Sequence, residues 1–233
     1  MSLRINKLYK SHHEIKLFQD FDIEIKEKTI TCILGPSGCG KTTLLNMISD
    51  TIQPDSGTFE GFDKKVISYI FQDPRLLPWK TVKENITFVL NGLYPKKEVG
   101  KIASTYLRLV ELIDFANFYP ASLSGGMKQR VAIARAFSYP SNLILMDEPL
   151  KALDLKLKLN LMNSFRRLWQ SDKRTVIFVT HDVDEALLLG NEILVFSKPP
   201  VNIKEKFTIN IKERTLNNPE IIDLKNKIWE VME

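Results

Sequence analysis

A glycine-rich stretch ending in a lysine and two threonines supplies residue types that bind phosphate groups. Residues 35–42, Gly-Pro-Ser-Gly-Cys-Gly-Lys-Thr, fit the pattern G-x-x-x-x-G-K-[ST]. Glycines let main-chain N–H groups surround phosphate oxygens, and the N-terminus of a following helix favours negative charge. Lys41 could reach the β- and γ-phosphates, Thr42 could ligate Mg²⁺, and Thr43 could contact the α-phosphate. The stretch predicts a nucleoside triphosphate site formed by Gly35, Ser37, Gly38, Cys39, Gly40, Lys41, Thr42 and Thr43.

Two adjacent carboxylates follow an apolar run near the middle of the chain. Asp147 and Glu148 come directly after Leu-Ile-Leu-Met, residues 143–146. The carboxyl end of a buried parallel strand is the edge at which ligands bind in open α/β sheets. We therefore expect Asp147 to hold Mg²⁺ and Glu148 to activate a water molecule as a general base.

Two further polar residues stand near the ends of apolar runs. Gln72 follows Ile-Ser-Tyr-Ile-Phe, and His181 follows Val-Ile-Phe-Val-Thr. Each taken alone could be an ordinary solvated strand end. Four polar strand ends in one chain favour a shared site, where Gln72 would sense Mg²⁺ and the attacking water and His181 would contact the γ-phosphate.

These residues need a sheet and helices to position them, and the hydrophobic pattern predicts both. Residues 3–9 and 21–26 alternate as half-solvated antiparallel strands do, whereas residues 29–34, 142–149 and 174–182 contain continuous apolar runs typical of buried parallel strands. Residues 55–72 indicate a hairpin and then a strand, and residues 81–137 have mostly helical periodicity. A strand within 204–211 and a helix over 219–232 complete the chain. The pattern predicts a layered α/β core with a helical insertion.

The composition is that of an ordinary globular protein. The chain has 233 residues, 44% hydrophobic and 26% charged, with a net charge of +5. The small positive excess is spread along the chain, which favours a solvated surface over a nucleic-acid-binding face. Cys32 and Cys39 have no metal-site spacing and are expected to be free thiols. The N-terminus has no signal-peptide pattern, and no apolar run is long enough to span a bilayer.

A second glycine-containing helix start lies at Ser124-Gly125-Gly126. Free N–H groups and the positive end of a helix dipole would suit a phosphate there. Glycines would allow close approach of the main chain. Within the helix that follows, Met127, Val131 and Ala134 are expected to pack inward, whereas Lys128, Gln129 and Arg130 are expected to face outward.

The order and spacing of these motifs resemble those of the ATPase subunits of ABC transporters. The resemblance covers nearly the whole chain and rests on residues 35–42, Gln72, LSGGMKQR, LILMDEP, Ala152-Leu153-Asp154 and His181. It implies an α/β fold with a RecA-like P-loop NTPase core, an antiparallel β edge and an inserted α-helical subdomain. The expected single domain spans 1–233, with the core in 1–80 and 138–233, the subdomain in 81–137, and a C-terminal strand and helix within 199–233.

The resemblance also implies roles for individual residues. Mg²⁺ would be held by Thr42, Gln72 and Asp147, and Gln72 would also link the metal and lytic water to the transmembrane partner. Glu148 would be the general base and His181 the switch on the γ-phosphate.

Further implied roles concern adenine binding and the dimer. Tyr9 is the candidate for stacking on adenine, and the alternative is an aromatic side chain at the end of an edge strand. Ser124, Gly125 and Gly126 would serve the ATP held by Lys41 of the partner subunit, and Asp154 would lie in the loop that crosses to that subunit.

One residue departs from the family pattern. Lys151 stands where a small residue is usual, immediately before Ala152. It could be a contact at the rim of the dimer interface or could tune dimer closure.

The segment FQDPRLLPWKTVKENI and the last helix resemble those of nitrate/sulfonate/taurine-type import ATPases. The expected protein is thus an ATP-hydrolysing, energy-coupling subunit at the cytoplasmic face of a membrane. Its expected partners are a second copy, integral membrane permease subunits and, indirectly, a solute-binding protein; nucleic acid is not expected. Trp79 could lie near the surface that receives the permease or could pack within the subdomain. The solute would be nitrate/sulfonate/taurine-like or a related organic compound such as a thiamine pyrimidine precursor.

The alternatives differ in partner or in chemistry. An exporter-type ATPase would have the same site and a different membrane partner. A soluble ABC ATPase acting on DNA or ribosomes is disfavoured, because the chain has one motif set and no long insertion between its motifs. A non-catalytic nucleotide-binding module is disfavoured because every catalytic position is filled.

Overall fold

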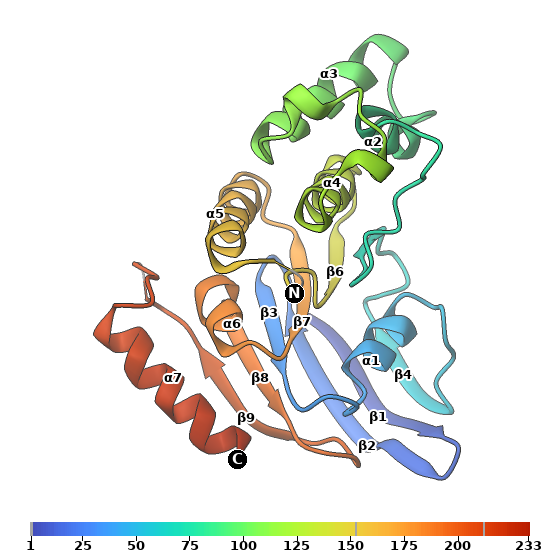
Figure 1. The fold of residues 1–233 in the computed structure, drawn as a ribbon. Helices are drawn as coiled ribbons and strands as arrows, with labels where there is room; N and C mark the ends of the chain where they lie inside the picture. The colour runs from blue at the N-terminus through green and yellow to red at the C-terminus, as the bar shows by residue number, and fades with distance from the viewer. Residues whose placement is uncertain (1, 152, 212) are drawn as a thin grey trace. The chain divides into compact units, whose positions relative to one another are not determined.

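The computed structural model describes residues 2–151, 153–211 and 213–233 (Figure 1). The chain divides into two compact units. The first unit comprises Met1–Ile67 and Arg174–Glu233, and the second comprises Ser68–Lys173. The second unit extends beyond the predicted helical segment 81–137 at both ends, because it includes strand residues and a further helix. The boundaries of a helical subdomain at 81–137 stay a prediction.

A three-stranded antiparallel sheet lies in the first unit. Its strand order is β2 (Ile15–Lys26), β1 (Ser2–His12), β4 (Ser56–Glu60). Phe21, Ile23 and Ile25 are buried in β2 while the residues between them are exposed, so the predicted alternation is confirmed.

The hairpin predicted within residues 55–72 is wrong. β4 pairs with β1, which is distant in sequence, and not with a strand that directly follows it in the chain. Gly57 explains how β4 can approach β1. Its φ is 122°, and a Cβ atom there would lie 3.0 Å from the Cα atom of Leu8. Only glycine combines this conformation with so close a main-chain contact.

The first unit also contains four strands in the order β7 (Thr175–Thr180), β3 (Ile30–Leu34), β8 (Glu192–Phe196), β9 (Ile203–Thr208). β3 pairs in parallel with both β7 and β8, whereas β9 is antiparallel to β8. Every residue of β3, β7 and β8 is buried, as expected for strands covered on both faces.

Three helices accompany these strands. They are α1 (Lys41–Ile48), α6 (Val183–Leu189) and α7 (Pro219–Met232). α6 packs against β3, and α7 packs against α6 and β8 (Figure 1). α7 has the bounds that the sequence predicts, since Asn218 caps its N-terminus and Pro219 occupies its first turn.

The second unit consists of most of β5, one buried strand, four helices and two short 3₁₀ turns. They are β5 (Ile67–Ile70), α2 (Val82–Leu90), α3 (Lys96–Leu109), η1 (Ile113–Phe115), η2 (Pro120–Ser122), α4 (Gly125–Ser138), β6 (Leu143–Asp147) and α5 (Leu155–Ser171). β5 and β6 are neighbouring strands. The 17-residue helix α5 is absent from the sequence prediction.

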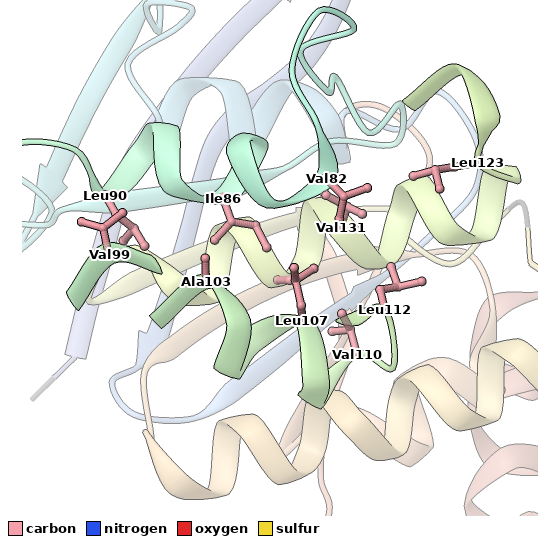
Figure 2. Packing of buried hydrophobic residues seen from close by; sticks show 11 residues of the cluster. Val82, Ile86, Leu90, Val99, Ala103, Leu107, Val110, Leu112, Leu123 and Val131 are labelled. Atoms are coloured by element: carbon pink, nitrogen blue, oxygen red, sulfur yellow. The ribbon is translucent and has the colours of Figure 1, made fainter. Parts of the chain in front are cut away.

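Helices α2, α3 and α4 pack around one apolar cluster. Figure 2 shows Val82 and Ile86 of α2, Leu107 of α3 and Val131 of α4 pointing toward one another. α2 begins at a capping box, in which Thr81 and Glu84 each accept a hydrogen bond from the other's main-chain N–H group. This cluster is the core on which α4, with its glycine-containing N-terminus, is mounted.

Candidate functional site

The glycine-rich loop connects β3 to α1 in the first unit. Gly38 and Gly40 have φ angles of 78° and 100°, in the left-handed region that favours glycine. A Cβ atom at Gly40 would lie 3.1 Å from the ring of Phe18, and one at Gly35 would lie 3.0 Å from the Cβ atom of Phe196. The loop conformation therefore depends on its glycines, and Gly40 leads directly into the first turn of α1.

Lys41 folds back over the loop that precedes it. Its ammonium donates hydrogen bonds to the carbonyl oxygens of Gly35, at 2.7 Å, and Pro36, at 2.9 Å. The residue is only 5% exposed, so its charge is held beside the loop and is largely removed from solvent. An anion entering the loop would meet a cation that is already positioned there.

The remaining loop residues differ in exposure. Ser37, Gly38 and Thr42 are exposed, whereas Cys39 is buried. Burial raises the pKa of the Cys39 thiol, and the nearby charge of Lys41 only partly opposes this effect. Cys39 is thus placed as a packing residue of the loop, with its thiol protonated at neutral pH.

His181 and the glycine-rich loop leave the same edge of the parallel strands. Leu34, the last residue of β3, pairs with Thr180, the last residue of β7. The main chain therefore reaches Gly35 from one strand and His181 from the neighbouring strand, and neighbouring strands are about 4.8 Å apart. His181 is exposed. The structure brings His181 to the edge at which the phosphate-binding loop begins, as the sequence predicts.

In the second unit, Asp147 ends β6 and is buried. Burial, and then the negative charge of Asp147, raise the pKa of Tyr69 on the neighbouring strand β5. Glu148 follows with a φ of 42°, unusual for a residue with a side chain. Its Oε2 atom lies 2.9 Å from the Nζ atom of Lys151. The turn after β6 separates the environments of the two carboxylates.

Gln72 lies two residues beyond β5 and is exposed. α4 holds the main chain on either side of it. Gln129 donates to the carbonyl oxygen of Phe71 at 3.5 Å, and Arg135 donates to those of Pro74 and Arg75, both at 3.0 Å.

The predicted outward orientation of Gln129 is wrong, because its side chain is 4% exposed and faces this segment. Sequence reasoning also missed Arg135. Gln129 and Arg135 are polar residues on the inward face of α4. Hydrophobic periodicity alone assigns polar residues to the solvent-facing side of a helix, so it gave no sign of their contacts.

Ser124 caps the N-terminus of α4 by accepting a hydrogen bond from the N–H group of Met127 at 3.3 Å. The two glycines that follow differ in their surroundings. A Cβ atom at Gly125 would meet nothing within 4 Å, whereas one at Gly126 would collide with the side chain of Leu157. Gly126 thus packs closely against the leucine side chains of α5 and the segment before it, whereas the space at Gly125 is open. The sequence pattern predicts the same role for both glycines, close approach of the main chain to a phosphate.

Asp154 caps α5, since its Oδ1 atom accepts a hydrogen bond from the N–H group of Leu157 at 3.0 Å. Ala152, part of the Ala-Leu-Asp motif, lies outside the described residues. Tyr9 is 39% exposed on β1 and Trp79 is 70% exposed. The exposed side chain of Trp79 disfavours the reading in which it packs within the helical subdomain.

The predicted residues thus fall into two sets. The first unit contains the residues predicted to contact the phosphates and the base of one nucleotide: Tyr9, the loop from Gly35 to Thr43, and His181. The second unit contains Gln72, Ser124, Gly125, Gly126, Asp147, Glu148 and Asp154. Within the described residues there is no cluster of three or more His, Cys, Asp and Glu side chains suited to a metal. Nor does that part of the chain contain a helix long and apolar enough to cross a membrane.

Comparison with known proteins gives a consistent family. The sequence profile described as ABC transporter matches residues 18–151. An uncharacterized ABC transporter ATP-binding protein of Methanocaldococcus jannaschii is 37% identical and is aligned over 100% of this chain and 91% of its own length. The aliphatic sulfonates import ATP-binding protein SsuB 1 of Pseudomonas savastanoi is 36% identical, covering 97% and 92%. The bicarbonate transport ATP-binding protein CmpD of Synechococcus elongatus is 34% identical, covering 95% and 86%.

Solved structures agree with the predicted fold. A dimeric bacterial ABC transporter cassette has a TM-score of 0.78 and 30% identity, covering 90% of this chain and 99% of the cassette. The same cassette in a post-hydrolysis state with ADP and phosphate has a TM-score of 0.76. The predicted fold class is therefore confirmed. With a matching family profile and relatives aligned along its length, the chain belongs to the ABC transporter family and is an ATPase.

Proposed function

We propose that this chain is the energy-coupling subunit of an importer for a small solute. The observation that carries the proposal is the loop between β3 and α1, whose conformation depends on glycines and whose lysine is buried and already positioned. Such a loop is suited to the phosphates of ATP. The names of two relatives, for aliphatic sulfonates and for bicarbonate, support import of a small anionic or related organic compound.

ATP would be held mainly by residues of the first unit. Lys41 neutralises charge on the β- and γ-phosphates, and the first turn of α1 directs N–H groups at them. Thr42 would supply a hydroxyl oxygen to Mg²⁺, and Gln72 and Asp147 would supply an amide and a carboxylate oxygen, the hard ligands that this ion prefers. When bound, Mg²⁺ would neutralise charge on the phosphate oxygens.

The chain's own residues would then assist hydrolysis of ATP. The water oxygen would bond to the γ-phosphorus as the bond to the β–γ bridging oxygen breaks, giving phosphate and ADP. Glu148 would accept the proton of that water, and His181 would donate a hydrogen bond to the γ-phosphate. Asp147, which is buried, remains a carboxylate ligand. The different environments of the two adjacent carboxylates support these different roles.

Two copies would complete the site. The capped N-terminus of α4, with Ser124 and the open position at Gly125, would contact the ATP held by Lys41 of the partner subunit. Asp154 would lie at the crossing between the copies. The dimeric cassette among the structural relatives supports this arrangement.

The remaining partners would be integral membrane permease subunits and, through them, a solute-binding protein. The chain would lie at the cytoplasmic face of the membrane. Trp79, which is 70% exposed, is a candidate contact for the permease.

Two measurements test the proposed function. The full chain should release phosphate from ATP only when Mg²⁺ is present, and affinity-tagged chain should co-purify from detergent-solubilised membranes with a polytopic permease. Absence of Mg²⁺-dependent hydrolysis at any protein concentration contradicts the enzymatic part. Recovery without a permease, or with a DNA or ribosomal complex, contradicts the transport part.

A further inference from the structure

Lys151 and Glu148 are joined twice across one turn. The Lys151 Nζ atom lies 2.9 Å from the Glu148 Oε2 atom, and the Lys151 N–H group donates to the Glu148 carbonyl oxygen at 3.3 Å. We propose that Lys151 is a positioning residue that fixes the carboxylate of Glu148 for water activation. This inference rests on the proposed role of Glu148 as the general base.

The burial of the two side chains is unequal, and this distinguishes the pair from an ordinary surface ion pair. The Glu148 side chain is 12% exposed, whereas that of Lys151 is 47% exposed. Two mobile, solvated side chains gain little from pairing, since ordering them opposes the attraction. Here the carboxylate is largely enclosed, so a cation at one of its oxygens restricts its rotation and partly replaces lost solvation.

The main chain at Glu148 adds a second restraint. A φ of 42° is disfavoured for a residue with a Cβ atom and is maintained only when the surroundings fix it. The hydrogen bond from the Lys151 N–H group closes the turn that begins at this residue. The turn brings Lys151 back beside Glu148, and the ion pair then restrains the Glu148 side chain.

A second carboxyl group, that of Asp147, stands next to the Glu148–Lys151 pair in the sequence. Asp147 precedes Glu148 and is buried, so two carboxyl groups are adjacent in sequence and only Glu148 is paired with Lys151. Two negative charges at neighbouring positions disfavour each other. The cation of Lys151 beside Glu148 offsets part of that repulsion.

The turn also continues toward the other groups of the second unit. The N–H group of Leu153 donates to the carbonyl oxygen of Leu150 at 3.3 Å, and Leu153 and Leu157 form the surface that Gly126 contacts. Asp154 begins α5 immediately afterwards. The position of the Glu148 carboxylate is thus tied, through Lys151, to the segment on which the N-terminus of α4 rests.

The experiment compares three lysine variants of the full chain with the parent. Lys151→Ala removes the pair, Lys151→Arg preserves a cation, and Lys156→Ala removes the same charge from an exposed lysine in the first turn of α5. Steady-state phosphate release gives kcat and KM, equilibrium titration gives the nucleotide Kd, and thermal unfolding reports folding. A crystal structure of Lys151→Ala reports the Glu148 rotamer.

For Lys151→Ala we expect kcat to fall about tenfold, the scale of a misplaced catalytic group, while KM and Kd stay within about twofold. Lys151→Arg should recover most of kcat, and Lys156→Ala should match the parent. The crystal structure should show the Glu148 carboxylate in a different rotamer. The proposal predicts a separation of kcat from binding, which a general loss of folding would not give.

The inference is overturned if Lys151→Ala has the parental kcat or a higher one, or if Lys156→Ala loses as much activity. A Glu148→Gln variant in the same assay separates failure of the inference about Lys151 from failure of the proposed function. If Glu148→Gln retains parental turnover, the assignment of the base is wrong. If Glu148→Gln is inactive while Lys151→Ala is unchanged, only the role of Lys151 is wrong.

Discussion

The ammonium of Lys41 lies 2.7 Å from the carbonyl oxygen of Gly35, at the start of its own loop. A buried cation bonded to main-chain carbonyls is satisfied without a ligand, yet those bonds are exchangeable for stronger ones to phosphate oxygens. The lysine therefore stabilises the loop and, in the proposed function, would also bind the phosphates of ATP.

Lys41→Ala should lose most of its affinity for ATP, because the cation at the β- and γ-phosphates is removed. Loss of the donor to Gly35 and Pro36 should also lower the free energy of unfolding by about 1–3 kcal/mol. Equilibrium binding of a fluorescent ATP analogue and chemical denaturation measure the two effects. Lys97→Ala, at an exposed position of α3, is the charge-matched control. Affinity retained by Lys41→Ala would contradict the role of the loop.

Glu148→Gln should bind ATP and hydrolyse it about 10²–10⁴-fold more slowly, because an amide cannot accept the proton from water. ATP that is not hydrolysed should hold two copies together, so the variant should elute as a dimer in ATP and Mg²⁺. Phosphate release and light scattering after gel filtration measure the two outcomes. Glu98→Gln, on the exposed surface of α3, should behave as the parent. Parental turnover by Glu148→Gln would exclude it as the base.

The two glycines at the start of α4 should respond differently to alanine. Gly126→Ala should gain less stability than Gly125→Ala by about 1 kcal/mol, since the Leu157 side chain must shift from its rotamer to admit the methyl group. Gly125→Ala should not destabilise the fold but should reduce hydrolysis, because in the proposed dimer its methyl group would stand where the second copy's nucleotide approaches. Denaturation curves and phosphate release separate these effects. Equal effects of both substitutions on stability would contradict the packing difference.

Ser124→Arg places a large side chain at the same helix end, at the residue that caps α4. It should stop hydrolysis while ATP binding to the monomer stays largely intact, because Lys41 and its loop are unchanged. Equilibrium binding at low protein concentration, compared with phosphate release at high concentration, provides the test. A variant that hydrolyses ATP normally would show that this helix end does not contact nucleotide.

Arg135→Met should loosen the segment that contains Gln72. The guanidinium donates to the carbonyl oxygens of Pro74 and Arg75, and burial lowers the pKa of Arg135. Hydrogen bonds made by charged groups contribute about 1.5–3 kcal/mol each, so both stability and local order should fall. Limited trypsin digestion, followed by mass spectrometry of cleavage at Arg75 and Lys80, measures local order. Arg135→Lys should be intermediate, and an unchanged cleavage rate in Arg135→Met would refute the link.

Strong local patterns made much of the fold predictable. The alternation in residues 21–26 and the Asn218-Pro219 start of the last helix each arise from short-range physics that the sequence displays directly. The phosphate-binding loop and its strand and helix were predictable for the same reason.

Long-range choices were not predictable in the same way. The pairing of β4 with β1 depends on strands that are distant in sequence. α5 was missed because Leu155–Leu159 alternates like a strand, although Leu161, Phe165 and Leu168 are buried at helical spacing. The orientation of Gln129 was predicted wrongly because the residue type alone does not reveal whether its amide is bonded to main chain or to solvent.

The close approach of Gly126 to Leu157 joins the start of α4 to the first turn of α5. Asp154 caps α5 just before that turn. A larger side chain at position 157 would therefore push on the start of α4, although Leu157 is not one of the residues predicted to contact nucleotide.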